Sequence, residues 1–189
     1  KYSQPRKSIL IFPSDEPQEA EEDDTPDYPV NLFFTREGYF KKITNQSLRM
    51  SADQKLKEGD SITQSVTATN RSELLFFTDK CQVYKTTAAD FDDTKASVLG
   101  DYLPAKLGMD SGENPVFMAV TTDYQGYLLF AFENGKAAKV PLSAYATKTR
   151  RRKLANAYSD KARLVQALQL AEDCEVLFTS SDTRMLIVH

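Results

Sequence analysis

The chain has 189 residues, with 27 acidic and 24 basic side chains, two cysteines and one histidine. This length corresponds to one domain, or to one domain and a tail, and it suffices to bury a core without a disulfide or a metal. One histidine and two cysteines are too few for a metal site built on Cys and His ligands. A Ser-His-Asp catalytic triad would have to use the terminal His189, because it is the only histidine.

Further exclusions follow from the apolar pattern and the cysteine spacing. No run of about 18 apolar residues occurs, so we expect no transmembrane helix and no signal peptide. Cys81 and Cys174 form no CxxC motif, which is typical of free thiols in a cytosolic protein, although a disulfide between them stays open.

Acidic residues are concentrated at the start of the chain. Residues 1–27 hold eight acidic and three basic side chains, so the remainder has a net charge of +2 within a total of −3. The stretch 13–29 combines proline and charge with almost no apolar residues. We therefore expect residues 1–30 to form an acidic, largely disordered linker before a folded domain over residues 31–189. The alternative is an acidic decoy that competes with nucleic acid for a basic surface.

One sequence motif recurs along the body of the chain. An apolar, aromatic-rich run is followed by a short polar turn and by a second run that ends in lysine. The copies occupy residues 31–42, 74–85 and 128–139, and a fourth begins at residue 185. Alignment of Gly38, Cys81 and Gly135 gives spacings of 43 and 54 residues. Such a period is typical of the blades of a propeller-like array.

Each copy predicts an antiparallel β-hairpin. The apolar run favours a strand buried on both faces, and Asn134-Gly135 favours positive φ at both turn positions. A further strand is expected before each later copy, at residues 65–69, 116–121 and 175–179. The window 153–170 has nearly helical spacing, but the other copies favour a strand over 164–170; a helical turn over 153–158 stays open.

The repeated motif resembles the C-terminal domain of the A subunits of DNA gyrase and topoisomerase IV. The resemblance covers residues 28–189 and is most specific over 31–43, 73–85 and 127–139. It implies an all-β fold, a β-pinwheel (propeller-like) array of antiparallel blades that exchange a strand between neighbours. Three copies and a partial one imply a piece of a larger ring with exposed edge strands.

The resemblance also implies a function. The family binds DNA on the outer rim of the ring, so residues 31–189 are expected to be a non-catalytic domain that bends or wraps double-stranded DNA. It would contact the DNA backbone without sequence specificity and would assist strand passage and supercoiling. No cofactor is expected in this chain, because ATP and Mg²⁺ act in other domains of an ATP-hydrolysing type II topoisomerase.

The implied partners are DNA, the A-subunit core and the B subunit, in the cytoplasm at the nucleoid and away from membranes. The alternative is a propeller-like protein-interaction module with no DNA role.

Basic side chains are the candidate DNA contacts, because lysine and arginine neutralise phosphates and release counterions. The densest cluster spans residues 148–153, on the loop expected after the third hairpin. The predicted DNA-binding residues are Lys136, Lys139, Lys148, Arg150, Arg151, Arg152, Lys153, Lys41, Lys42, Lys55 and Lys85. A solvated basic loop without a ligand is the alternative.

Two further features bear on function. Gyrase carries a Gln-Arg-Arg-Gly-Gly-Arg-Gly box in its first blade that is needed to wrap DNA. The equivalent loop here is residues 54–60, which keeps Gln54 and Lys55 but lacks the Gly-Gly pair, so tight wrapping by this loop stays open. The carboxylates at Asp90, Asp92, Asp93, Asp110 and Glu113 are rival catalytic candidates, but their turn-like surroundings favour solvated loops.

Overall fold

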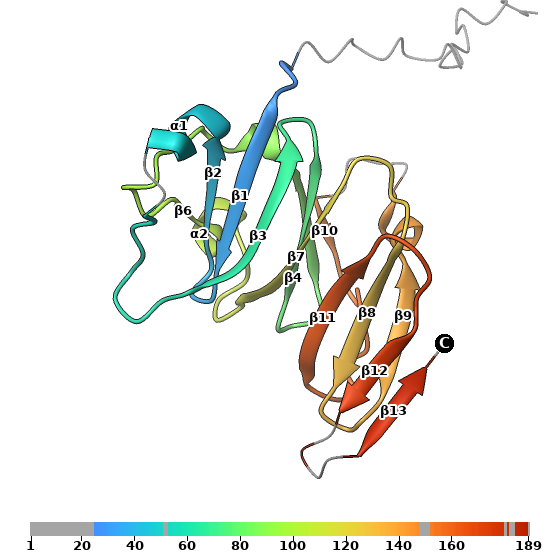
Figure 1. Cartoon of the computed structure of the whole chain (residues 1–189). Coiled ribbons are helices and arrows are strands. Elements are labelled where there is room, and N and C mark those ends of the chain that lie inside the picture. Colours follow the sequence, from blue (N-terminus) through green and yellow to red (C-terminus); the bar gives the residue numbers. More distant parts are fainter. Residues whose placement is uncertain (1–24, 51–52, 148–151, 180, 182–183, 189) are drawn as a thin grey trace, which may run out of the picture.

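The computed structural model describes residues 25–50, 53–147, 152–179, 181 and 184–188 (Figure 1). Most of the predicted linker therefore lies outside the described residues, and the first strand begins at Pro29. The strands are β1 (Pro29–Thr35), β2 (Tyr39–Thr44), β3 (Ile62–Thr69), β4 (Glu73–Thr78), β5 (Val83–Thr87), β6 (Asp101–Tyr102), β7 (Pro115–Thr121), β8 (Tyr127–Phe132), β9 (Ala137–Pro141), β10 (Lys153–Leu154), β11 (Leu164–Leu170), β12 (Val176–Thr179) and β13 (Met185–Val188). Short helices are α1 (Asn45–Met50), α2 (Leu103–Lys106), η1 (Ala88–Asp90) and η2 (Leu142–Tyr145).

Each predicted hairpin belongs to one antiparallel sheet. The pairs β1–β2, β4–β5 and β8–β9 are the three hairpins, as the repeat predicts. The sheets have the orders β3-β1-β2-β6, β10-β5-β4-β7 and β11-β8-β9, which we call blades 1, 2 and 3. The all-β prediction is confirmed, and the blades lie beside one another in Figure 1.

The third strand of each blade belongs to the hairpin that precedes it. β3 pairs with β1, β7 with β4 and β11 with β8. The predicted strands at 65–69 and 116–121 are therefore confirmed: each precedes the next copy in sequence, but it pairs with the hairpin before it. Their equivalent in blade 3 is β11, so the strand prediction for 164–170 is confirmed. No helical turn forms over 153–158, where β10 is followed by bends.

The fourth copy starts earlier than the sequence alignment places it. β12 and β13 pair with each other from Val176–Val188 to Thr179–Met185. β13 is thus the second strand of this hairpin, and the prediction that the copy begins at residue 185 is wrong. Glu175 before β12 corresponds to Glu73 at the start of β4. The apolar content of β13 made it look like a first strand.

Neighbouring blades exchange a strand, as the resemblance implies. β6 follows the hairpin of blade 2 in sequence, yet it pairs with β2 of blade 1. In the same way β10 follows the hairpin of blade 3 and pairs with β5 of blade 2. We call the edges formed by these donated strands the rims of blades 1 and 2.

The hairpin turns share one backbone geometry. The amides of Gly38, Cys81 and Gly135 donate to the carbonyl three residues earlier, at 3.1, 3.1 and 3.0 Å. All three residues have positive φ, at 81°, 55° and 74°. Asn134 does not have positive φ, so the turn is a three-residue loop closed by one left-handed residue, and the prediction of two such residues is wrong.

The central strands are buried on both faces because consecutive side chains enter different cores. Leu74 and Phe76 of β4 pack against Phe34 and Phe40 of blade 1 in one apolar cluster. Their neighbours Leu75 and Phe77 belong to a second cluster with Phe130 of blade 3. All of these side chains are at most 1% exposed. The aromatic residues of the motif are thus core residues, as predicted.

Glutamine side chains join the blades at the edge opposite the rims. The amide group of Gln64 on β3 exchanges two hydrogen bonds with the backbone of Met118 on β7, at 2.7 and 2.9 Å. Gln169 on β11 does the same with the backbone of Val120, at 2.7 and 3.0 Å. Gln64 from blade 1 and Gln169 from blade 3 thus satisfy backbone N–H and carbonyl groups at the edge of β7. They also hold β3, β7 and β11 side by side.

Both cysteines are free thiols, as predicted. Within the described residues, no helix has the length and apolar character needed to cross a bilayer.

Two glycines with the same backbone conformation offer a test of this packing. A Cβ on Gly126 would lie 2.4 Å from the Leu170 carbonyl oxygen, whereas a Cβ on Gly135 would meet no atom within 4 Å. Both have positive φ, so Gly135→Ala should cost about 1 kcal/mol for the left-handed conformation. Gly126→Ala should cost clearly more, because β8 and β11 must also separate. Urea denaturation of both variants measures the difference, and equal losses would contradict the close approach.

Candidate nucleic-acid interface

The lysines at the end of the first hairpin point into the structure. Lys41 is 1% exposed, and its ammonium donates to the carbonyl oxygens of Lys55 and Ala96 and to Gln54 Oε1, at 2.6, 3.2 and 3.3 Å. Burial lowers the pKa of the Lys41 ammonium. Lys42 is 3% exposed and donates to Asn70 Oδ1 at 2.8 Å. These two lysines are structural, which corrects the expectation that they present charge at the surface.

Lys42, Lys85 and Lys139 share one position in the three copies, and they share an environment. Each ammonium lies over a tyrosine ring and beside a carboxylate. The ring centroids are at 5.8 Å for Tyr28, 4.9 Å for Tyr124 and 4.4 Å for Tyr127. The carboxylates are Asp93 at 3.2 Å, Glu73 at 3.9 Å and Asp173. The lysine that ends each hairpin is thus a clamp between segments, and cation–π and ionic contacts explain its recurrence.

Lys85 and Lys139 differ in exposure. The Lys85 side chain is 11% exposed and also donates to the Tyr145 carbonyl oxygen at 3.0 Å, so it is structural like Lys42. The Lys139 side chain is 34% exposed, on β9 of blade 3, and its charge is matched by Asp173. Lys136 is exposed just after the β8–β9 turn.

The basic cluster over residues 148–153 leads into the rim of blade 2. Arg152 and Lys153 are exposed, and the Arg152 carbonyl oxygen accepts the backbone N–H of Lys85 at 2.7 Å. Lys153 begins β10 and pairs with Tyr84 in the strand register. The predicted contacts Lys148, Arg150 and Arg151 lie outside the described residues. The structure thus attaches the end of this cluster to a blade edge, a pairing that no local sequence signal indicates.

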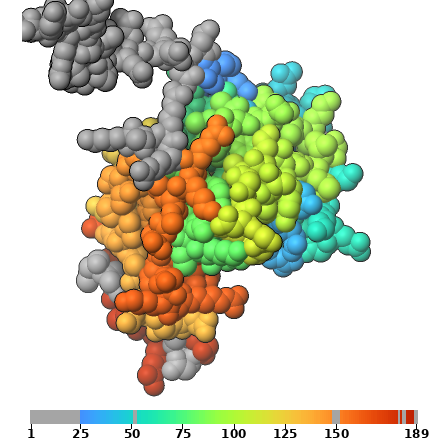
Figure 2. Space-filling view, turned by 180° about the vertical axis from the view of Figure 1, so that it is seen from behind, coloured from blue at the N-terminus to red at the C-terminus, as the bar shows by residue number. Residues whose placement is uncertain are grey.

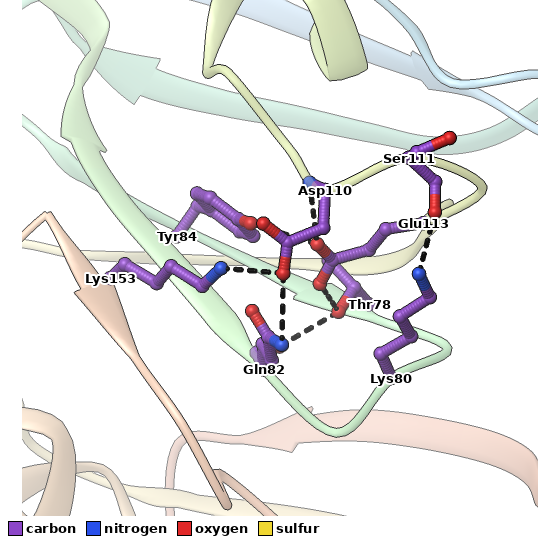
Figure 3. Close-up of polar contacts among 8 residues, drawn as sticks. All are labelled: Thr78, Lys80, Gln82, Tyr84, Asp110, Ser111, Glu113 and Lys153. Carbon is purple, nitrogen blue, oxygen red and sulfur yellow. Dashed lines mark hydrogen bonds and ion pairs between the residues drawn. The ribbon is translucent and has the colours of Figure 1, made fainter.

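Lys153 is held at the rim by a network of polar contacts (Figure 3). Its ammonium donates to Asp110 Oδ2 at 2.8 Å and lies 5.4 Å from the centroid of the Tyr84 ring. These contacts raise the pKa of Lys153 to about 12, and the same hydrogen bond lowers the pKa of the Asp110 carboxyl. The Lys153 charge is therefore largely matched within the protein.

Glu113 anchors the loop that carries Asp110. The Glu113 carboxylate is 2% exposed and accepts hydrogen bonds from the Thr78 hydroxyl, the Tyr84 hydroxyl at 2.8 Å and the Asp110 backbone N–H at 3.0 Å. The expectation that Glu113 lies in a solvated loop is wrong. Its partners Thr78 and Tyr84 are 35 and 29 residues away in sequence, so no local signal could have revealed this site. The network fixes the loop and the rim; it offers no pair of facing carboxylates for catalysis.

The loop of residues 54–60, which the resemblance predicts to be the equivalent of the gyrase box, is only partly available to a ligand. Gln54 turns inward to Lys41, while Lys55 and Lys57 are exposed. Asp60 Oδ1 accepts the backbone N–H groups of Glu37 and Ser61 at 3.0 and 2.7 Å, which ties the loop to the first hairpin turn. The loop therefore presents two lysines on a segment that also carries acidic side chains.

Three solved structures that superpose on this chain are C-terminal domains of DNA topoisomerases. The C-terminal domain of DNA topoisomerase IV superposes with a TM-score of 0.71 and 21% identity, covering 86% of this chain and 52% of that one. The chain has the β-pinwheel fold of that domain. The E. coli ParC C-terminal domain gives a TM-score of 0.64 at 18% identity, covering 85% of this chain and 64% of that one. The DNA gyrase A C-terminal domain gives 0.53 at 15% identity, with 85% and 54% covered.

Sequence comparison leads to the same group. The chain is 29% identical over 157 residues to the A subunit of DNA gyrase from Streptomyces coelicolor, and 28% identical over 153 residues to its counterpart from Mycoplasma pneumoniae. Each match covers 77% of this chain but 18% of the relative, so the chain spans less than a fifth of those proteins. No family model matches the sequence.

Buried and exposed lysines of the candidate set should differ in their effect on stability. Lys41→Met removes the donor for three acceptors, and leaving buried acceptors without partners costs about 1–3 kcal/mol. Lys55→Met, at an exposed side chain, should change the free energy of unfolding by at most about 0.5 kcal/mol. Urea denaturation of both variants checks this, and a neutral Lys41→Met would refute the structural role.

The Asp110–Lys153 pair should be visible in a titration. Because Lys153 lowers the Asp110 pKa, the pair stabilises the fold above the ordinary aspartate pKa, and this contribution is lost as the pH falls through the lowered value. Lys153→Met should move the Asp110 pKa upward. Lys80→Met removes a weaker electrostatic influence and should move it less. NMR titration of the Asp110 carboxyl measures both shifts, and equal shifts would contradict the direct pair.

Proposed function

We propose that this chain is the C-terminal domain of the A subunit of a type II DNA topoisomerase, and that it binds the backbone of double-stranded DNA along its rim. The observation that carries the proposal is the placement of the basic cluster: its described end is a donated strand at the edge of blade 2. The shared fold and the similarity to gyrase A subunits support the same function. Lys41, Lys42 and Lys85 are left out of the proposed interface.

The rim suits contact with phosphates. The edges β3, β7 and β11 are joined to one another, so the rims of successive blades point away from that junction. Arginines on such an edge reach a duplex lying across it and bind phosphate oxygens with two donors each. Contacts of this kind fix the duplex without reading its sequence. A duplex that follows more than one rim must bend, at a cost that the phosphate contacts offset.

The wider role belongs to the assembly. A bound and bent segment beside the A-subunit core would be presented for strand passage, with ATP and Mg²⁺ used by other domains and by the B subunit. This chain would position and bend the DNA, since the network at Asp110 and Glu113 holds the rim without offering catalytic groups.

A protein-interaction module is the second candidate, and the fourth hairpin favours it. Leu177, Met185, Leu186 and Ile187 are between 55% and 71% exposed, which forms an apolar surface suited to a protein partner. A gel shift with duplex DNA at low and high salt separates the two functions. Binding that is lost at high salt supports the DNA role, and absence of binding at low salt supports the module.

Replacing the three adjacent arginines tests the proposed interface directly. Arg150, Arg151 and Arg152 changed together to Ala should leave the fold stable, because such surface changes are usually within about 0.5 kcal/mol each. If each arginine neutralises one phosphate, the slope of log affinity against log salt should become shallower by roughly 2.7. The loss should be equal on two duplexes of unrelated sequence. A folded variant with an unchanged slope would place the DNA elsewhere.

A further inference from the structure

The start of the described chain is tied to the loop between β3 and β4. Arg71 Nε donates to the Thr25 carbonyl oxygen at 2.7 Å, and Asn70 Nδ2 donates to the Pro26 carbonyl oxygen at 2.9 Å. The Asn70 N–H also donates to the Tyr28 carbonyl oxygen at 2.9 Å. The segment that precedes Thr25 is therefore attached to the domain at this loop.

The same loop leads to a notch between blades 1 and 2. The Ser72 carbonyl oxygen accepts the Ala88 N–H at 2.9 Å, so the loop contacts the start of η1, which ends at Asp90. The notch has a volume of about 220 Å³ and is lined by Tyr84, Lys85, Thr86, Asp90, Phe91, Lys106, Leu107 and Arg152. Figure 2 shows the orange segment that follows Arg152 beside the yellow-green segment that contains Lys106, with the blue start of the described chain at the top.

Two of the three cations at the notch have carboxylate partners. Lys85 lies 3.9 Å from Glu73, and Lys106 lies 3.7 Å from Asp101. These two lysines are therefore matched within the fold, and the third cation, Arg152, is the candidate for binding a further anion.

Arg152 has donors available for such an anion. It is exposed, and none of the described residues accepts a hydrogen bond from its guanidinium, which has five N–H donors. Its acidic neighbour is Asp90, whose Oδ2 accepts three hydrogen bonds from Thr86 and Thr87, at 2.7 to 3.0 Å. Burial opposes the shift, but these hydrogen bonds and the charge of Arg152 lower the pKa of the Asp90 carboxyl. Asp90 is thus satisfied by the threonines, and the guanidinium can bind another carboxylate or a phosphate.

The segment attached beside the notch is strongly acidic. Residues 15–24 hold seven acidic side chains and no basic one. They lie outside the described residues and end directly before Thr25. A segment of this length extends over at most about 35 Å, so its attachment keeps the carboxylates near the notch. Tethering of this kind gives an effective concentration on the order of millimolar.

We propose that residues 15–24 bind at this notch through Arg152 and thereby compete with DNA for it. The segment and the duplex are both polyanions, and both use the exposed guanidinium. DNA that binds at this rim must displace the acidic segment, which lowers the apparent affinity for DNA. This consequence rests on the proposed DNA-binding function, whereas the contact itself does not.

Paramagnetic relaxation measures the contact without DNA. A nitroxide is attached to a cysteine introduced by Ala20→Cys, in a chain that also carries Cys81→Ser and Cys174→Ser. The Lys106 amide signal should broaden at low salt, and Arg152→Gln should reduce the broadening because the charged anchor is lost. Thermal unfolding checks that each variant is folded. Broadening that is the same with and without Arg152→Gln would overturn the contact.

Matched glutamate substitutions measure the competition. One variant removes three charges from the segment: Glu19→Gln, Glu21→Gln and Glu22→Gln. The control removes three charges from exposed positions elsewhere in the fold: Glu58→Gln, Glu133→Gln and Glu172→Gln. Duplex affinity at low salt should rise several-fold more in the first variant than in the control. Combination with Arg152→Gln should abolish the difference.

The outcomes separate this inference from the function on which its consequence rests. Equal gains in affinity from the two glutamate variants would indicate general charge repulsion and would overturn the competition while leaving DNA binding in place. If the wild-type chain shows no salt-dependent DNA binding, the proposed function and the competition fail together, and the relaxation experiment still decides the contact.

Discussion

The fold depends on central strands whose consecutive side chains enter two different cores. Because Phe76 faces blade 1 and Phe77 faces blade 3, blade 2 has no solvent-exposed side in its middle. Burial of a phenylalanine side chain contributes about 1.5–3 kcal/mol, so each blade is stabilised mainly by its neighbours. This constraint explains why the motif is a continuous apolar run. It also confines charged and polar side chains to the edges of the blades.

At those edges, charge has two distinct uses. The lysine that ends each hairpin lies between a tyrosine ring and a carboxylate, where it joins segments that the apolar core does not reach. At the blade 2 rim, Arg152 and Lys153 are exposed, and Lys153 begins the donated strand β10. The net charge of −3 thus conceals two groups of basic residues: lysines that carboxylates match within the fold, and exposed residues at the rim, of which Lys153 is matched by Asp110.

The sequence predicts the hairpins well because their signals are local. An apolar run, a turn residue and a lysine lie within twelve residues of one another in each copy. It predicts the strand partners poorly. β3 pairs with the hairpin that precedes it, whereas β6 pairs with β2 of the neighbouring blade, and the residues of these strands do not indicate which partner each takes. The same limit applies to the candidate interface. Lys41 and Lys153 are both basic residues near strand ends, and only the tertiary partners Ala96 and Asp110 reveal which of them is buried.

The donated strands also set an order in time. Blade 1 receives β6 only after the hairpin of blade 2 has been synthesised, and blade 2 receives β10 only after the hairpin of blade 3. On a ribosome, where the N-terminal part of a chain emerges first, each blade must wait incomplete for a segment encoded downstream. Blades 1 and 2 are therefore completed in chain order, and each offers an unpaired edge until the donated strand has emerged.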